Sequence, residues 1–109
     1  MAQTQTLIPI QAALNNSGVY SAYFEIKKDV KVPYNVWRGV GQNTALADDT
    51  VYTKMSNIYE VEHHFKKKDE TIETAIEDAL IAEGFLYAKG EDLRDDETAT
   101  YYVTYTVWR

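Results

Sequence analysis

The sequence contains no cysteine, and this absence removes several classes of protein at once. Without a thiol the chain cannot form disulfides, use a thiolate nucleophile, build a cysteine-based zinc finger or ligate an iron–sulfur cluster. Any metal site would consist of histidine and carboxylate side chains. The chain also lacks an apolar run of about 20 residues, the length that spans a bilayer. Its start, Met-Ala-Gln-Thr-Gln-Thr, has neither the basic residues nor the apolar core of a signal peptide, so we expect a soluble, cytoplasmic protein.

Proline and glycine are scarce as well, with two and five residues, and the sequence has no low-complexity tract or linker. The 109 residues carry 17 acidic and 11 basic side chains, which gives a formal net charge of −6. A chain of this length buries roughly two-thirds of its unfolded surface, enough for one core and too little for two. We therefore expect a single domain over residues 1–109.

Aromatic residues are abundant by contrast: they form 13% of the chain, and nine of them are tyrosine. Most of the tyrosines fall in segments with the pattern of β-strands, where large half-buried rings fit a pleated surface. Tyrosine is also enriched at protein interfaces, because its ring buries area while its hydroxyl keeps a partner. The tyrosines therefore indicate strands, an interface, or both.

Apolar periodicity and turn residues predict two helices and a set of strands. A stripe that includes Leu7 predicts a helix over residues 5–16, with Gly18 as its terminator. A clearer stripe over Ile72–Leu80 predicts a second helix, which acidic residues precede and Gly84 ends. The expected strands cover residues 19–26, 34–40, 51–65, 85–92 and 98–109, with a polar turn over 93–97 between the last two.

Glycines and aspartates break the strand pattern between about residues 39 and 50, and we expect an irregular, hairpin-like excursion there. The element order is then α-β-β-(β)-β-α-β-β, with one optional strand. Strands that follow one another without helices pair antiparallel, and two amphipathic helices suffice to cover one face of a sheet. The predicted fold class is therefore α+β: a mostly antiparallel sheet with two amphipathic helices packed on one face.

The alternation within the strands assigns their side chains to two faces. Apolar residues that begin with Tyr59 and Val61 share the face toward the helices, and Glu73 of the second helix is expected to point away from that core. The opposite face is polar and aromatic together; it carries Glu60, Glu62, His64, Tyr102, Thr104, Thr106 and Trp108. Such a face is either solvated or reserved for a partner.

Glu60, Glu62, His63 and His64 form the one cluster with metal-ligand residue types. Two ligands on one strand face without a third make a poor metal site, so a charged cross-strand ladder is the favoured interpretation. No serine sits in a Gly-x-Ser-x-Gly turn, and Gly39-Val40-Gly41 lacks the third glycine and the helix of a phosphate loop. We expect no enzyme and no cofactor; a metal-dependent enzyme built on the two histidines is the remote alternative.

Two lysine clusters, over residues 27–31 and 66–68, are candidates for contact with nucleic acid if they converge in space. The acidic net charge opposes long-range attraction to phosphate. The simpler interpretation is that both clusters are solvated turns.

The second half of the chain shows a distinctive succession of segments. Residues 57–69 read Asn-Ile-Tyr-Glu-Val-Glu-His-His-Phe-Lys-Lys-Lys-Asp, a helix over residues 70–84 closes with Glu-Gly-Phe, and a last strand alternates tyrosine and valine over residues 101–107. In this order the segments resemble small tail-terminator or tail-completion proteins of long-tailed phages and prophages of Gram-positive bacteria. The resemblance covers residues 57–85 and 100–108.

The resemblance implies an α+β subunit that assembles as a homo-hexameric ring on the last ring of the major tail-tube protein. Such a ring stops tail polymerisation and receives the head connector or stopper protein, while DNA passes through it without specific binding. It implies a virion protein at the head–tail junction, made in the host cytoplasm, with no catalysis, cofactor or membrane. A head-completion or connector stopper, a tail-tube subunit and a non-virion protein-binding module remain open.

Four residues in and beside the expected excursion are predicted partner contacts: Trp37, Arg38, Gln42 and Asn43. Tryptophan and arginine are the residue types that dominate interface energetics when they are exposed. The alternative for Trp37 is a place in the core on its own strand.

Overall fold

The computed structural model describes residues 8–26, 30–43 and 56–109. Within these ranges the elements are α1 (Pro9–Asn16), β1 (Ser21–Tyr23), β2 (Tyr34–Asn43), β3 (Ser56–Phe65), α2 (Glu70–Ala82), β4 (Leu86–Asp95) and β5 (Thr100–Trp108). Their α-β-β-β-α-β-β order confirms the predicted α+β class, without the optional strand in the part of the chain described.

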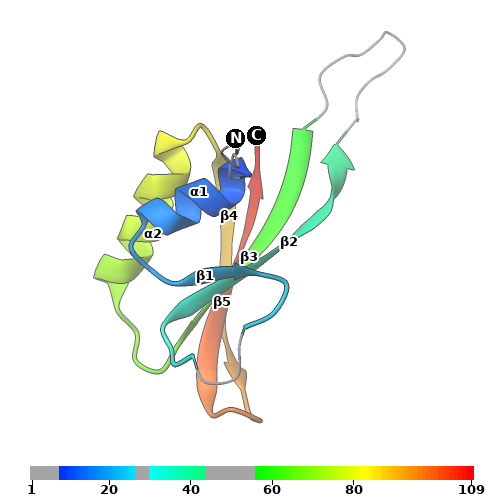
Figure 1. The fold of residues 1–109 in the computed structure, drawn as a ribbon. Coiled ribbons are helices and arrows are strands. Elements are labelled where there is room, and N and C mark those ends of the chain that lie inside the picture. Colours follow the sequence, from blue (N-terminus) through cyan, green and yellow to red (C-terminus); the bar gives the residue numbers. More distant parts are fainter. Residues whose placement is uncertain (1–7, 27–29, 44–55) are drawn as a thin grey trace, which may run out of the picture.

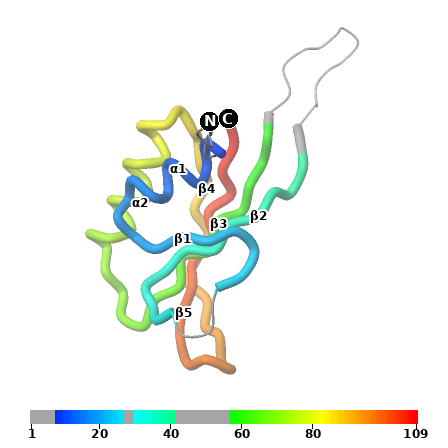
Figure 2. The backbone as a smooth tube through the Cα atoms, in the orientation of Figure 1, coloured from blue at the N-terminus to red at the C-terminus, as the bar shows by residue number. Residues whose placement is uncertain are grey.

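The strands form one five-stranded sheet in the order β1-β2-β3-β5-β4. All neighbours pair antiparallel except β1, which runs parallel to β2, so the sheet is mostly antiparallel as predicted. Both helices lie on one side of this sheet and contact each other (Figure 1). The short β1 and the long β4 are its two edges, and Figure 2 traces the backbone between them.

The core lies between the helices and the sheet face that they cover. Its buried hydrophobic side chains are Ile10, Ala13, Leu14, Trp37, Val61, Phe65, Ile76, Leu80, Phe85, Val103, Tyr105 and Val107. Burial of each such large side chain contributes roughly 1.5–3 kcal/mol, so this layer holds the fold together. The predicted alternation in β3 and β5 is confirmed.

Helix α1 begins at Pro9, which suits a first helical position because that position needs no backbone N–H donor. The predicted residues 5–7 lie outside the described part. The helix ends where the N–H of Gly18 donates to the carbonyl of Asn15 at 3.1 Å and Gly18 adopts φ +85°, which confirms its predicted role as terminator.

Helix α2 begins after Asp69, whose carboxylate accepts from the backbone N–H groups of Thr71 and Ile72. It ends at Gly84, which adopts φ +90° as predicted. The expectation for Glu73 is wrong: this residue is 1% exposed and lies against the sheet. Its burial has a physical reason, because two lysines from other elements meet its carboxylate.

Several strand boundaries differ from the prediction. Strand β1 ends at Tyr23 rather than at residue 26, because the left-handed backbone of Phe24 (φ +70°) breaks the strand. Strand β4 continues to Asp95, so the turn to β5 spans residues 96–99 instead of 93–97. A bulge between Lys89 and Asp92 keeps β4 in pairing register with β5 over this extra length.

The expected excursion at 39–50 is only partly within the described residues. Residues 39–43 belong to β2, where a bulge between Gly39 and Gly41 absorbs the glycines without ending the strand. Gly41 adopts φ +133°, a conformation that glycine tolerates and other residues rarely adopt. The strand therefore extends beyond the predicted residue 40, and residues 44–50 lie outside the described part.

Candidate interaction surface

One face of the sheet has no helix over it in the described chain, and we call it the open face. Strand pairing arranges its side chains in four transverse rows: Tyr34, His64 and Tyr102; Val36, Glu62 and Thr104; Arg38, Glu60 and Thr106; Ile58, Trp108 and Leu86. The sequence placed the β3 and β5 members of these rows on one face, and the register confirms that assignment. Polar, charged, aromatic and apolar side chains thus share a face formed by the four neighbouring strands β2, β3, β5 and β4.

The first row is a stack of three rings. The His64 ring lies 5.0 Å from that of Tyr34 and 5.3 Å from that of Tyr102, with interplanar angles of 24° and 22°. Nε2 of His64 lies 3.0 Å from a carboxylate oxygen of Glu62 in the next row. The row therefore presents flat aromatic surface with its one polar ring already paired to a carboxylate.

The third row carries an exposed ion pair. The guanidinium of Arg38 lies 2.5 Å from the carboxylate of Glu60, and the two side chains are 49% and 29% exposed. Such a surface pair contributes about 0–1 kcal/mol to stability. Arg38 is thus accessible on the open face, as its predicted role in partner contact requires.

The fourth row is apolar and lies at the other end of the face. Trp108 of β5 is half-buried between Ile58 of β3 and Leu86 of edge strand β4, and Leu86 is 57% exposed. Together Ile58, Leu86 and Trp108 give this end of the face an apolar surface. One end of the open face is therefore apolar and the other aromatic, with charged side chains between them.

Of the other three predicted contact residues, Trp37 does not join Arg38 on this face. Trp37 is 5% exposed, and its indole N–H donates to Oε1 of Gln11 at 2.6 Å. It therefore lies in the core, which was the alternative to a partner contact. The backbones of Gln42 and Asn43 pair with β3 near its start, at Asn57 and Ser56; their side chains lie outside the described part.

His63 and His64 point to opposite faces of β3. His63 is 1% exposed; its Nδ1 lies 2.9 Å from Oδ1 of Asn35, and the amide of Asn35 donates to Oγ of Ser21. Burial lowers the pKa of His63 to about 4, against a smaller opposing effect of Glu73. In the described residues no group of three His, Asp or Glu side chains is arranged to hold a metal ion.

A buried charge cluster joins α2 to the sheet, and sequence reasoning missed it. Glu73 receives Nζ of Lys89 at 2.7 Å and Nζ of Lys68 at 2.9 Å, and Lys68 also pairs with Asp92 at 3.0 Å. Burial alone would raise the pKa of Glu73, but the hydrogen bonds from the two lysines outweigh it and lower the pKa. A signal was available: Glu73 falls at helical spacing from buried Ile76 and Leu80.

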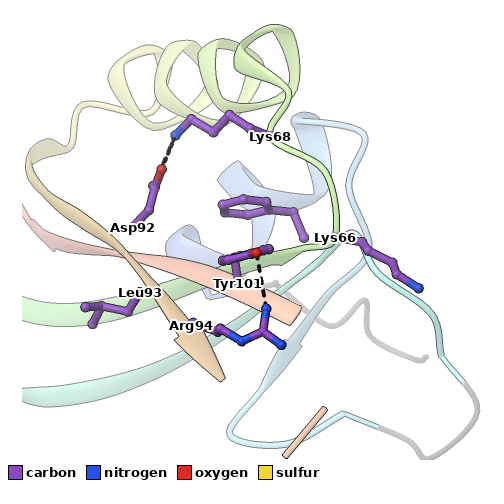
Figure 3. A pocket seen from close by; sticks show the side chains of 7 residues that line it. Lys66, Lys68, Asp92, Leu93, Arg94 and Tyr101 are labelled. Atoms are coloured by element: carbon purple, nitrogen blue, oxygen red, sulfur yellow. Dashed lines mark hydrogen bonds and ion pairs between the residues drawn. The ribbon is translucent and has the colours of Figure 1, made fainter. Parts of the chain in front are cut away.

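Beside this cluster lies a hollow of about 310 Å³ at the edge of the sheet, which we call the basic hollow (Figure 3). It is lined by Phe65, Lys66, Lys68, Asp92, Leu93, Arg94 and Tyr101. The Phe65 and Tyr101 rings stack 5.9 Å apart, and the Arg94 guanidinium lies 5.4 Å from the Tyr101 ring centre and donates to its hydroxyl. The basic hollow thus combines an aromatic floor with a rim that carries cationic side chains.

The lysine clusters converge only in part. Lys31 and Lys66 line one further hollow of about 560 Å³ that also contacts the β4–β5 hairpin. Lys27 and Lys28 lie outside the described residues. Lys68 is already occupied by Glu73 and Asp92, so this lysine is not a free contact for phosphate.

At the opposite edge, two aromatic side chains stand out into solvent. Tyr23 is 58% and Phe24 62% exposed; we call this pair the aromatic edge. Their rings meet at 5.5 Å, and the Tyr23 ring rests on the Trp37 ring at 4.8 Å. The sequence predicted Phe24 on a strand face. The left-handed turn that exposes it was not predictable, because the residue in this conformation is not a glycine.

No protein-family model matches the chain, and no curated protein matches it. Among the described helices, none is long and apolar enough to cross a membrane. The function is therefore inferred from the residues and their arrangement.

Proposed function

We propose that the chain is a structural virion protein at the head–tail junction of a long-tailed phage or prophage. In this role it is a tail terminator: a ring of copies caps the tail tube, ends its polymerisation and receives the head connector. The segments that carry the resemblance support the proposal, because residues 57–85 and 100–108 supply β3, α2 and β5. These three elements are neighbours at the centre of the fold.

The observation that carries the proposal is the open face. It joins an aromatic row, an exposed Arg38–Glu60 ion pair and an apolar row with exposed Leu86, and no layer covers it in the described chain. Aromatic and apolar side chains combined with arginine are typical of protein interfaces. A ring subunit needs such surface, because it contacts two neighbouring copies, the tail-tube protein and the head connector.

The acidic net charge of −6 supports the same role, since a lumen of like charge lets duplex DNA pass without adhering. Specific, salt-sensitive binding of duplex DNA by the purified protein would contradict this part of the proposal.

Disruption of the gene in the source phage or prophage, followed by induction and negative-stain electron microscopy, tests the role. We expect full heads separated from tails of uncontrolled length, because nothing then stops polymerisation. Complementation with the intact gene restores joined particles and serves as the control. Intact infectious virions would refute a virion role and favour a non-virion binding module.

The same images separate the neighbouring roles. Heads beside unattached tails of normal length indicate a head-completion or stopper protein. Absence of tails indicates a tube subunit. Either outcome would overturn the tail-terminator assignment and keep the protein within the virion.

A further inference from the structure

Phe24 holds an unusual backbone conformation for an exposed aromatic residue. Its φ is +70°, and the N–H of Glu25 donates to the carbonyl of Tyr23 at 2.8 Å, which closes a three-residue turn around it. This is the rare, strained form of the γ-turn, in which a residue with a large side chain is disfavoured. The 62% exposed ring gains little from the chain itself in return. Strain of this kind occurs where a side chain is presented to a ligand or partner.

Contacts with Trp37 fix the backbone of the aromatic edge. The N–H of Phe24 donates to the carbonyl of Trp37 at 2.8 Å, and the Tyr23 ring packs on the Trp37 ring in the core. A side chain that is fixed before binding loses little conformational entropy on docking. Phe24 is therefore suited to insert into a hollow, with the carboxylate of Glu25 directly beside it.

The basic hollow has the complementary chemistry. Its walls carry Lys66, Lys68 and Arg94; Lys68 is paired with Glu73 and Asp92 and Arg94 with Asp96, so Lys66 is the cation that these ion pairs leave for the carboxylate of a partner. Its floor is the stacked pair of Phe65 and Tyr101. A ring followed by a carboxylate finds there an aromatic surface and positive charge. The volume, about 310 Å³, suits one such side-chain pair.

The two features lie on opposite edge strands, the aromatic edge on β1 and the basic hollow beside β4. A contact between different surfaces of identical subunits repeats around a ring when its rotation closes. We propose that Phe24 and Glu25 of one copy insert into the basic hollow of the next copy. The proposal rests on the ring assembly proposed above and names its subunit contact.

Cysteine cross-linking tests this contact cleanly, because the chain has no cysteine of its own. Purified full-length Phe24→Cys is mixed with Asp92→Cys, whose position lines the hollow on the same strand face as Arg94, at high concentration under mild oxidation, and covalent dimers are quantified by non-reducing electrophoresis. A disulfide needs Cα atoms about 4.4–6.8 Å apart, so only docked surfaces react efficiently. We expect a strong dimer band in the mixture and a weak one with either variant alone.

The matched control is Ile81→Cys mixed with Asp92→Cys, because Ile81 is 53% exposed on α2 and does not belong to β1. A Phe24–Asp92 band no stronger than this control overturns the proposal, and so does a dominant dimer of Phe24→Cys alone. Glu25→Cys with Arg94→Cys repeats the test without replacing the strained residue. Circular dichroism verifies that each variant is folded.

Charge reversal gives an independent readout. Adding Lys66→Glu to the Asp92→Cys chain should lower the cross-linking yield about tenfold, the effect of about 1.4 kcal/mol of lost contact. Adding Glu25→Lys to the Phe24→Cys partner should then restore it. Failure of the second change to restore the yield contradicts the pairing of these charges.

The outcomes separate this contact from the proposed function. A mixed dimer together with intact virions after gene disruption leaves the contact standing and removes the tail-terminator role. Tails of uncontrolled length together with no mixed dimer leave the role standing and overturn the contact.

Discussion

His63 shows how a single buried polar side chain is satisfied in a small domain. The amide of Asn35 donates to Ser21 and turns its oxygen toward Nδ1 of His63, and Ser21 in turn donates to the carbonyl of Val19. The neutral imidazole fits this chain because Nδ1 donates and the amide oxygen accepts. The charged form would have to be accommodated at a site that is 1% exposed.

This burial predicts a loss of stability in mild acid. The pKa of His63 is about 4 in the folded protein and ordinarily 6.5, so the unfolded chain binds the extra proton first. The contribution of neutral, buried His63 to the free energy of unfolding is fully present above pH 6.5 and is lost as the pH falls toward 4. A depression of this size corresponds to roughly 3 kcal/mol. Urea unfolding at a series of pH values measures the effect.

Two variants identify the side chain that causes this dependence of the free energy of unfolding on pH. His63→Gln should flatten the decline between pH 6.5 and 4, whereas His64→Gln on the open face should retain it. Equal slopes for the parent and His63→Gln would show that another group is responsible.

At the scale of elements, the charge cluster fastens α2 to edge strand β4. Glu73 is the hub, with Lys68 from the β3–α2 loop and Lys89 from β4 both bound to its carboxylate. Lys89 also pairs with Glu77 at 2.9 Å, and Glu77 accepts the Tyr105 hydroxyl proton at 2.8 Å. Burial and then Glu77 raise the pKa of Tyr105, so this hydroxyl stays a donor.

Glu73→Gln should therefore destabilise the fold. The neutral amide removes the charge that Lys68 and Lys89 share, and because both lysines are partly exposed and keep Asp92 and Glu77 as partners, we expect a cost of about 1–3 kcal/mol. Glu70→Gln, an exposed position on the same helix, should change the free energy of unfolding by less than about 0.5 kcal/mol. Chemical denaturation measures both, and hydrogen exchange should show lost protection in β4. A change for Glu73→Gln as small as for Glu70→Gln would mean that the cluster contributes nothing.

The sequence predicted the elements that depend on local rules and missed those that depend on distant partners. Alternation placed Val61 and Glu60 on opposite faces, and Gly18 and Gly84 end their helices as expected. The strand after Gly18 proved shorter because the left-handed turn at Phe24 follows no local composition rule.

The candidate site was predictable to a similar degree. The open face and the exposed Arg38 follow from the two-residue period of strands. Helical spacing indicates that Glu73 faces the core, but its two lysine partners did not follow from the sequence, because they are 5 and 16 residues away and meet it only in the folded chain. Trp37 illustrates the same limit: a strand residue's face is set by the register of its neighbours, and that register buried it.

At the scale of the whole molecule, the fold separates stability from contact surface. The helices and the covered sheet face hold the core, while the open face and the two edges carry exposed aromatic, apolar and charged groups. Substitutions on the open face can therefore impair assembly without unfolding the subunit.

Thr106→Arg tests this separation. Thr106 is exposed in the centre of the open face and faces Glu60 across the strands, so the new cation has a carboxylate beside it. The free energy of unfolding should stay within about 0.5 kcal/mol of the parent, because the site is on the surface. If the chain has the proposed virion role, the titre in complementation of a phage with the gene disrupted should fall about tenfold or more, since the long cation blocks close docking of a partner.

The matched control is Thr74→Arg, the same replacement at an exposed position of α2, on the opposite side of the sheet. It should complement fully and unfold like the parent. If Thr106→Arg also complements fully, the open face is a solvated surface, and assembly must depend on the sheet edges alone. If both arginine variants fail while folded, the partner surface extends around α2, and the division between a stabilising layer and a contact layer is wrong.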